Sequence, residues 1–316
     1  MEPSTVYQPP NRTEATIEAV NPISLGTVDN RLQEVTVIVV TYESAHCIDA
    51  LDALLSRCPH VIVVDNGSHD GTAVAAQNRW PHANVLALEH NHGFGSANNK
   101  ALARVHTPWA LLLNPDCLLE PETLARMIHT GETMPDAAII APQLRDANGR
   151  TQINYRWPIT EWASKGPGAD GPCCVGFVCG AAMLLRMALI PKPVFDERFF
   201  LYYEDDDLCL RLLKQRKSIV VLPDCVATHR SRGSVRGTKR LQNEYLRGYH
   251  HIQSKLTFLK KHQSTKSAKR ARRVLLMTTI ITTLTRLLIP NLRLISRTIG
   301  RWTGLLQWKP TIHRQK

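Results

Sequence analysis

Acidic side chains are missing from the last part of this 316-residue chain: no Asp or Glu follows Glu244. Of the 39 Lys and Arg residues, 16 lie between Arg247 and Lys316, so the first 246 residues carry 23 basic and 27 acidic side chains. The formal charge of +12 therefore arises in the tail. This pattern excludes a uniformly basic protein and separates a mildly acidic body from a basic appendage.

The N-terminal region lacks a long apolar run. Residues 1–30 are polar, contain proline and show no continuous apolar stretch of the kind that a secretory signal peptide needs. We therefore expect the body to stay in the cytoplasm.

The CxxC pairs of zinc sites are also absent. The eight cysteines are scattered, and most of them have apolar neighbours. Reduced thiols are the favoured interpretation, and disulfides are the alternative.

The length and the hydrophobic content of 43% fit one large α/β domain with appendages. We expect a disordered leader over residues 1–33, a catalytic domain over 34–244 and a basic helical tail over 245–316. The chain shows no internal repeat.

Short apolar runs alternate with helical patterns between residues 35 and 113. This alternation is typical of a mostly parallel sheet with helices on both faces. The predicted strands cover residues 35–40, 61–64, 85–88 and 111–113, and the predicted helices cover 47–56, a segment ending near 79, and 96–105.

Polar residues follow three of these predicted strands, at 41–43, 65–68 and 114–116. Ligands bind beyond the carboxyl ends of the strands in such sheets. These three segments therefore predict one site. Residues 65–68 are also favoured in ordinary turns. The functional interpretation has Asp65 accepting a hydrogen bond from a pyrimidine base while residues 41–43 hold the base or the ribose.

Asp116 follows a strand at a position where its carboxylate must be solvated or bind a ligand. A divalent ion that bridges two phosphates typically takes one or two protein carboxylates, so Asp116 is a candidate metal ligand. A simple turn carboxylate is the alternative. His229, after a predicted strand at 220–222, is either a surface histidine or a further metal ligand.

Four consecutive acids, residues 204–207, follow an aromatic segment and precede a helical pattern at 208–214. One or two acids would suffice to complement the helix N-terminus. Mutual repulsion and the aromatic flank would raise the pKa of an inward-facing carboxyl towards that of a useful general base. We favour this function over helix capping.

Taken together, these segments resemble the family 2 glycosyltransferases of the GT-A fold, particularly the bacterial rhamnosyltransferase-like branch. Six motifs occur in the expected order across about residues 35–230. They are VIVVTY at 37–42, VVDNGSHDGT at 63–72, NHGFGSANN at 91–99, LLLNPD at 111–116, GAAM at 180–183 and FFLYYEDDD at 199–207.

The resemblance implies roles for individual residues. Asp205 would be the general base, and Asp116 would hold Mg²⁺ or Mn²⁺ with His229 as a further ligand. Asn114 departs from the strict Asp-x-Asp metal motif, so metal binding would depend partly on the donor's phosphates. The residues expected to contact the nucleotide are Thr41, Tyr42, Glu43, Asp65, Asn98 and Asn114.

The reaction implied by the resemblance is an inverting sugar transfer. Asp205 would deprotonate an acceptor hydroxyl, whose oxygen displaces the diphosphate in one step. The resemblance favours deoxythymidine diphosphate rhamnose as donor and a saccharide or lipid-linked saccharide as acceptor, in cell-surface polysaccharide synthesis.

Two other functions are compatible with a similar sheet. Sugar nucleotidyltransferases typically carry a Gly-rich loop with a basic residue after the first strand, which residues 41–44 do not match. A non-catalytic nucleotide- or carbohydrate-binding scaffold is the other alternative. The presence of both Asp205, a candidate base, and Asp116, a candidate metal ligand, argues against it.

The uncharged run at residues 274–285 is too short and too rich in Thr for a helix that spans a membrane. We expect a helix lying on the anionic cytoplasmic membrane surface, with a core-packing helix as the alternative. No nucleic-acid-binding module accompanies the charge. The expected apolar residues are Leu275, Leu276, Ile280, Leu284, Leu287 and Leu288, with Arg286, Arg293, Arg297 and Arg301 at polar positions and Trp302 and Trp308 as anchors.

Overall fold

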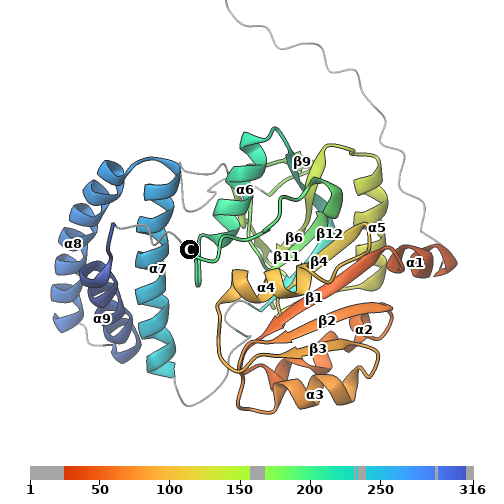
Figure 1. Cartoon of the computed structure of the whole chain (residues 1–316), viewed down its shortest axis with the longest axis horizontal. Coiled ribbons are helices and arrows are strands. Elements are labelled where there is room, and N and C mark those ends of the chain that lie inside the picture. Colours follow the sequence, from red (N-terminus) through yellow and green to blue (C-terminus); the bar gives the residue numbers. More distant parts are fainter. Residues whose placement is uncertain (1–24, 157–167, 231–232, 234–239, 289–290, 311–316) are drawn as a thin grey trace, which may run out of the picture.

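The computed structural model describes residues 25–156, 168–230, 233, 240–288 and 291–310. Within these ranges, a mixed ten-stranded sheet is covered by helices on both faces, and three further helices follow at the C-terminal end (Figure 1).

The first half of the sheet is parallel, in the order β3, β2, β1, β4. Successive side chains of a strand point to opposite faces. Val37 and Val39 of β1 accordingly join one hydrophobic cluster, and Ile38 joins the other. This half confirms the predicted parallel arrangement. Its strands are β1 Val35–Thr41, β2 His60–Asp65, β3 Asn84–Ala87 and β4 Trp109–Leu113.

The second half of the sheet is mixed. Strand β11 runs antiparallel between β4 and β6, and β12 pairs with β6 in parallel and with β5 antiparallel. A separate two-stranded sheet joins β8 to β10. The strands are β5 Cys117–Leu119, β6 Ala137–Arg145, β7 Thr151–Gln152, β8 Tyr155–Arg156, β9 Cys173–Cys174, β10 Phe177–Val178, β11 Ala182–Arg186 and β12 Ser218–His229.

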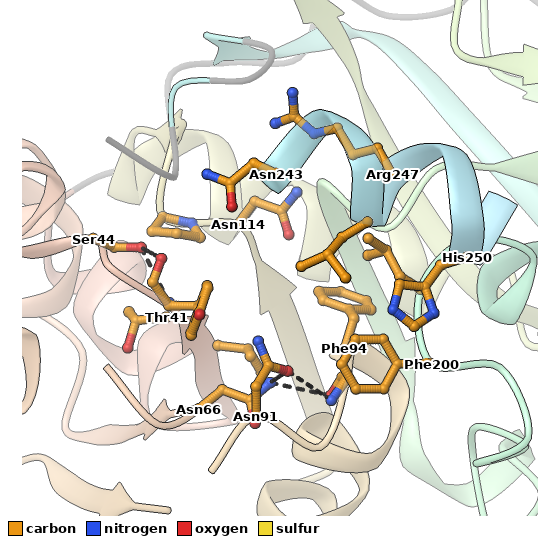
Figure 2. A pocket seen from close by; sticks show the side chains of 16 residues that line it. Thr41, Ser44, Asn66, Asn91, Phe94, Asn114, Phe200, Asn243, Arg247 and His250 are labelled. Atoms are coloured by element: carbon orange, nitrogen blue, oxygen red, sulfur yellow. Dashed lines mark hydrogen bonds between the residues drawn. The ribbon is translucent and has the colours of Figure 1, made fainter. Parts of the chain in front are cut away.

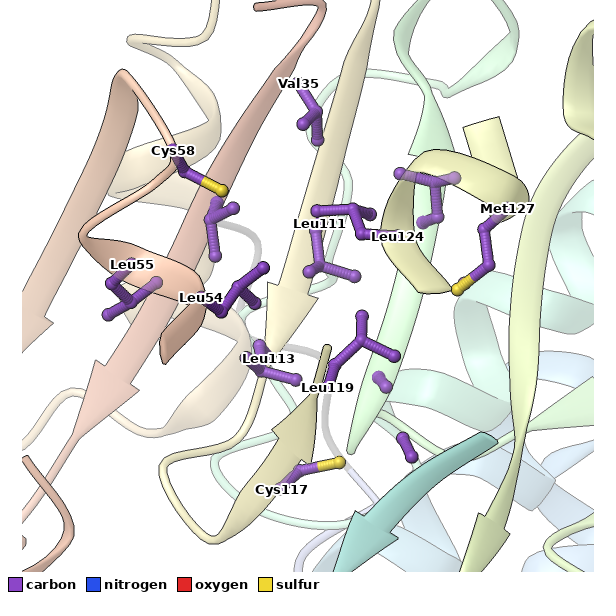
Figure 3. Packing of buried hydrophobic residues seen from close by; sticks show 14 of the residues in the cluster. Val35, Leu54, Leu55, Cys58, Leu111, Leu113, Cys117, Leu119, Leu124 and Met127 are labelled. Atoms are coloured by element: carbon purple, nitrogen blue, oxygen red, sulfur yellow. The ribbon is translucent and has the colours of Figure 1, made fainter. Parts of the chain in front are cut away.

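Helices bury their apolar faces on both sides of this sheet. One cluster lies under α1, α2, α3 and α5, and Figure 3 shows Leu54 of α2 and Leu124 of α5 meeting Leu111 of β4. The other cluster lies under α4 and α6. The helix expected over 47–56 is reduced to two 3₁₀ turns and the short α2. The helices are α1 Leu25–Leu32, α2 Asp52–Leu55, α3 Thr72–Arg79, α4 Phe94–Leu102, α5 Pro121–Glu132 and α6 Glu204–Lys214.

All eight cysteines are free thiols, which confirms the expectation from their spacing. Burial raises the pKa of Cys58 to about 12 and also raises that of Cys209. These two side chains act as small hydrophobic groups, because an un-ionised thiol is a poor nucleophile.

Helix α1 corrects the expected leader. Residues 25–32, predicted to be disordered, form a helix whose Val28 and Leu32 are fully buried against the first cluster. Arg31 also forms an ion pair with Glu132 of α5. The apolar side chains on one face of α1 explain this packing. Residues 1–24 lie outside the described residues.

Helices α7 Arg240–His262, α8 Thr265–Leu288 and α9 Leu292–Gln307 form a bundle beside the sheet domain (Figure 1). The domain boundary expected after Glu244 falls inside α7. This helix packs on the sheet domain, because the ring centre of Phe258 lies 5.3 Å from that of Tyr203 and Ser254 Oγ donates to the Leu201 carbonyl over 2.8 Å. The bundle has its own small core, made of Ile252, Leu256, Ala268, Leu305 and Trp308.

The two tryptophans expected to anchor the tail in a membrane serve the bundle instead. Trp308 is buried in its core, and Trp302 Nε1 donates to Thr283 Oγ1 over 2.9 Å. A short bundle gains much of its buried surface from such large side chains. Leu275 and Leu276 likewise pack against the core.

The carboxylate of Asp207 joins the start of α6 to the end of α7. Asp207 is fully buried and accepts from Arg211 Nε over 2.8 Å, from Lys261 Nζ over 2.5 Å and from His262 Nε2 over 2.7 Å. Burial alone would raise the pKa of Asp207, but the hydrogen bonds from His262 and Lys261 and the charge of Arg211 lower it. The carboxyl is therefore ionised at neutral pH.

Replacing Asp207 by Asn keeps the side-chain volume and removes the negative charge that Arg211, Lys261 and His262 contact. We expect Asp207→Asn to lower the free energy of unfolding by about 3 to 5 kcal/mol, because the largely buried Arg211 and Lys261 lose a fully buried carboxylate partner. Urea unfolding followed by circular dichroism measures the loss. The exposed Asp224→Asn is the matched control and should stay within about 0.5 kcal/mol. A loss below about 1 kcal/mol for Asp207→Asn would contradict this role.

Candidate active site

A pocket of about 240 Å³ lies at the carboxyl ends of β1 and β4 and is closed on the other side by α7 (Figure 2). The polar segments that follow the predicted strands meet here, as expected for a parallel sheet. We call it the first pocket. Its lining residues are Val40, Thr41, Tyr42, Ser44, Asn66, Asn91, Gly93, Phe94, Asn114, Pro115, Phe200, Leu201, Asn243, Leu246, Arg247 and His250.

Three of the expected nucleotide ligands, Thr41, Tyr42 and Asn114, line the first pocket. Asp65 is not among the lining residues, but it contacts one of them, Thr41. Its carboxylate is buried, accepts from Thr41 Oγ1 over 3.2 Å and also accepts from the hydroxyl of Ser68. Asp65 therefore braces the turn that carries the pocket wall.

Glu43 and Asn98 are not among the residues that line the first pocket. Glu43 Oε1 accepts from the backbone N–H of His69 over 3.1 Å. Asn98 is buried inside α4, where its amide donates to the Phe94 carbonyl over 2.9 Å. The direct contact expected for Asn98 does not fit this position, because the helix itself uses its polar group.

A second pocket, of about 410 Å³, adjoins the first. Phe94, Asn114 and Leu201 line both. The second pocket contains three acids at the start of α6 together with five Phe and Tyr rings. Its other lining residues are Ile153, Asn154, Tyr155, Arg156, Phe177, Cys179, Gly180, Ala181, Tyr202, Tyr203, Glu204, Asp205, Asp206 and His229.

Asp205 has the ionisation behaviour of a general base. Burial, and then the charge of Asp206, raise the pKa of Asp205 to about 7, although N–H groups of Asp206 and Gly180 donate to its oxygens over 2.9 and 3.2 Å. Burial and the neighbouring Asp205 raise the pKa of Glu204 well above its usual range. Of the two carboxyls, Asp205 therefore has the pKa closer to that of a useful general base.

Asp206 and Arg156 form a buried ion pair in the wall of the second pocket. Arg156 Nη2 lies 2.6 Å from Asp206 Oδ1, and the guanidinium stacks 4.0 Å above the centre of the Phe177 ring. Burial raises the pKa of Asp206, and Arg156 opposes this shift. The pair connects residues 50 positions apart and holds the first turn of α6 against β8 and β10.

The expected metal ligands lie together at the ends of β4 and β12. Asp116 Oδ1 is 3.5 Å from His229 Nε2, and Asp116 Oδ2 accepts from the backbone N–H of Gly233 over 2.9 Å. One cation contacting both groups at about 2.1 Å would require a separation below about 4.2 Å. The oxygen and nitrogen donors fit a divalent ion. Within the described ranges no group of three or more His, Cys, Asp or Glu gathers, so further ligands would come from substrate phosphates or water.

Helix α7 supplies pocket residues that the motifs did not predict. Asn243, Arg247 and His250 face the strand ends across the first pocket (Figure 2). His250 stacks on Phe200 with the ring centres 4.3 Å apart, and burial lowers the pKa of His250 to about 4. The tail is therefore part of the site and not a separate appendage. A helical pattern alone does not indicate which body a helix packs against.

Comparisons with known proteins agree with this geometry. The model of glycosyl transferase family 2 matches residues 36–190. An N-acetylglucosaminyl-diphospho-decaprenol L-rhamnosyltransferase of Mycobacterium tuberculosis is 28% identical over 231 residues, covering 61% of this chain and 75% of that protein. The low-salt glycan biosynthesis hexosyltransferase Agl10 of Haloferax volcanii is 25% identical over 203 residues, covering 60% and 64%.

The fold is also similar to that of a solved enzyme. A mannosyltransferase from Pyrobaculum calidifontis, in complex with GDP-Man and Mn²⁺, has a TM-score of 0.53 over 87% of both chains at 15% identity. The mixed sheet with its flanking helices thus resembles the GT-A fold of glycosyltransferases. The chain belongs to glycosyltransferase family 2 and has rhamnosyltransferase-like relatives. This membership decides against the nucleotidyltransferase interpretation.

Replacing Asp205 by Asn tests the proposed base. We expect sugar transfer to fall by a factor of about 10² to 10⁴, because the amide cannot accept the acceptor proton. Nucleotide binding should be unchanged, since Asp205 lines the second pocket and not the first. Single-turnover assays and calorimetry measure the two properties, with Asp224→Asn as the control. Wild-type transfer rates in Asp205→Asn would rule out this residue as the base.

The raised pKa of Asp205 predicts how the rate of transfer depends on pH. Because the base acts in its ionised form, the rate should be lost as the pH falls through about 7 and should level off above that value. A pH profile of kcat/KM measures this limb. A rate that is flat between pH 5.5 and pH 8.5, where the protein remains folded, would be inconsistent with it.

Proposed function

We propose that the protein is an inverting, metal-assisted transferase that moves a sugar from a nucleotide diphosphate carrier to a saccharide on a lipid. The observation that carries this proposal is the position of Asp205. Its carboxyl, with a pKa of about 7, lines a pocket that shares a wall with the pocket at the strand ends. A nucleotide donor in the first pocket and an acceptor in the second would meet at this wall.

The mechanism follows from this arrangement. The acceptor hydroxyl loses its proton to Asp205 as its oxygen attacks the anomeric carbon from the side opposite the diphosphate. The bond from the anomeric carbon to the diphosphate breaks in the same step, so the configuration inverts. Asp116 and His229 would hold Mg²⁺ or Mn²⁺, which offsets charge on the leaving diphosphate when bound.

The rhamnosyltransferase of Mycobacterium tuberculosis supports a specific pair of substrates. Its name describes transfer of L-rhamnose to N-acetylglucosaminyl-diphospho-decaprenol. We extend this chemistry to the present chain as deoxythymidine diphosphate rhamnose and a diphospho-lipid-linked sugar, for cell-surface polysaccharide synthesis on the cytoplasmic side.

The outer face of α8 supports contact with an anionic membrane surface. Lys266, Arg270 and Arg273 are exposed at helical spacing, and the same stripe continues with apolar side chains that are each more than half exposed. This pattern is typical of helices that lie in the membrane interface. No helix in the described part of the chain is long and apolar enough to cross a bilayer. The apolar residues are Met277, Ile281, Leu284 and Leu288.

A donor panel tests the substrate class. With Mn²⁺ or Mg²⁺ and a diphospho-prenol-linked N-acetylglucosamine acceptor, we expect transfer from deoxythymidine diphosphate rhamnose and strong inhibition by EDTA. Asp116→Asn should raise the metal concentration needed for half-maximal rate, because one carboxylate ligand is lost. Full activity in EDTA would contradict metal assistance. No transfer from any nucleotide sugar would contradict the proposed function.

Vesicle binding tests the membrane contact. Ile281→Glu places a charge in the apolar part of the stripe and should reduce co-sedimentation with phosphatidylglycerol vesicles by about tenfold or more. Val74→Glu is the matched control, because Val74 is also exposed but belongs to α3 of the sheet domain. Equal binding of Ile281→Glu and the wild type would contradict this contact.

A further inference from the structure

Arg247 is the cationic residue of an otherwise neutral first pocket. Of the 16 residues that line this pocket, only Arg247 and His250 have basic side chains, and none has an acidic one. Burial lowers the pKa of His250 to about 4, so His250 is neutral at physiological pH. The positive charge in this lining therefore comes from α7, opposite Thr41 and Asn114 (Figure 2).

The surroundings of Arg247 leave this part of the pocket positive. Arg247 Nη1 lies 2.8 Å from Glu244 Oε1, and the other oxygen of Glu244 lies 3.9 Å from Arg297 Nη1. One carboxylate is thus shared by two guanidinium groups. The contact with Glu244 engages one nitrogen of Arg247, and a guanidinium carries five N–H donors on three nitrogens. The side chain is about one quarter exposed, at 23%.

The other arginine near the two pockets is committed to the fold. Arg156 is 9% exposed, lies 2.6 Å from the buried Asp206 and stacks on Phe177. Moving Arg156 to a ligand would leave the carboxylate of Asp206 buried without its counterion, which is costly. Arg247 has no such constraint, because Glu244 retains Arg297 nearby.

We propose that Arg247 binds a diphosphate group in the first pocket, so that the helical tail contributes directly to substrate binding. The guanidinium is planar and matches two phosphate oxygens at once. Two substrates of the proposed function carry this group, the nucleotide donor and the diphospho-lipid acceptor. The inference rests on that function and adds a positioning role for α7.

The first experiment compares full-length Arg247→Gln and Arg247→Lys with the wild type by calorimetric titration of deoxythymidine diphosphate and uridine diphosphate. Loss of a charge-assisted contact should weaken binding of the preferred nucleotide by about tenfold or more in Arg247→Gln. Arg247→Lys should recover part of the affinity, because it keeps the charge and loses the planar geometry. Arg293→Gln, at an exposed position of α9, removes one charge from the same tail outside the pocket and should bind normally.

The second arm separates the two sources of diphosphate. At saturating donor, KM is measured for a diphospho-prenol-linked sugar and for the same sugar on an uncharged lipid. Weaker nucleotide binding in Arg247→Gln assigns the contact to the donor. Normal nucleotide binding with a raised KM for the diphospho-lipid alone assigns it to the acceptor. If neither value changes in a folded variant, the inference is overturned. If the wild type binds neither nucleotide, the proposed function itself is contradicted.

Discussion

The buried carboxylate of Asp207 is the constraint on which both halves of the site depend. Arg211 of α6 and Lys261 and His262 of α7 donate to this carboxylate and compensate its removal from water, and a buried charge is tolerated only under such conditions. Asp205 lies two residues earlier on α6, and Arg247 lies on the helix that ends at His262. One electrostatic anchor therefore fixes the proposed base and the far wall of the first pocket relative to each other.

The sequence predicted the parts of the site whose chemistry is local. Thr41 and Asn114 end apolar strands, and a parallel sheet brings such ends together whatever the helices between them do. The raised pKa of an acid in this segment, here Asp205, was predictable because four adjacent acids exceed what a helix terminus needs. The ion pair of Asp206 with Arg156 was not, since it joins a helix to a two-residue strand 50 positions away.

The wrong predictions concern segments of the tail whose local sequence pattern is compatible with more than one packing partner. The lack of acids after Glu244 suggested a separate tail, but α7 carries Ser254 and Phe258 on the face that meets the sheet domain. Trp308 in a basic segment resembled a membrane anchor, although the small bundle core uses it. Helical periodicity identifies an apolar face, and only the tertiary structure identifies what covers it.

Phe94, Asn114 and Leu201 line both pockets, so these three side chains form a partition between the two proposed substrate sites. A change of side chain in this partition alters the volume available on each side at once. Donor choice and acceptor choice are then not independent traits of this fold. Homologues that adopt a bulkier donor sugar would do so together with a compensating change in the acceptor, and the two specificities would evolve as one.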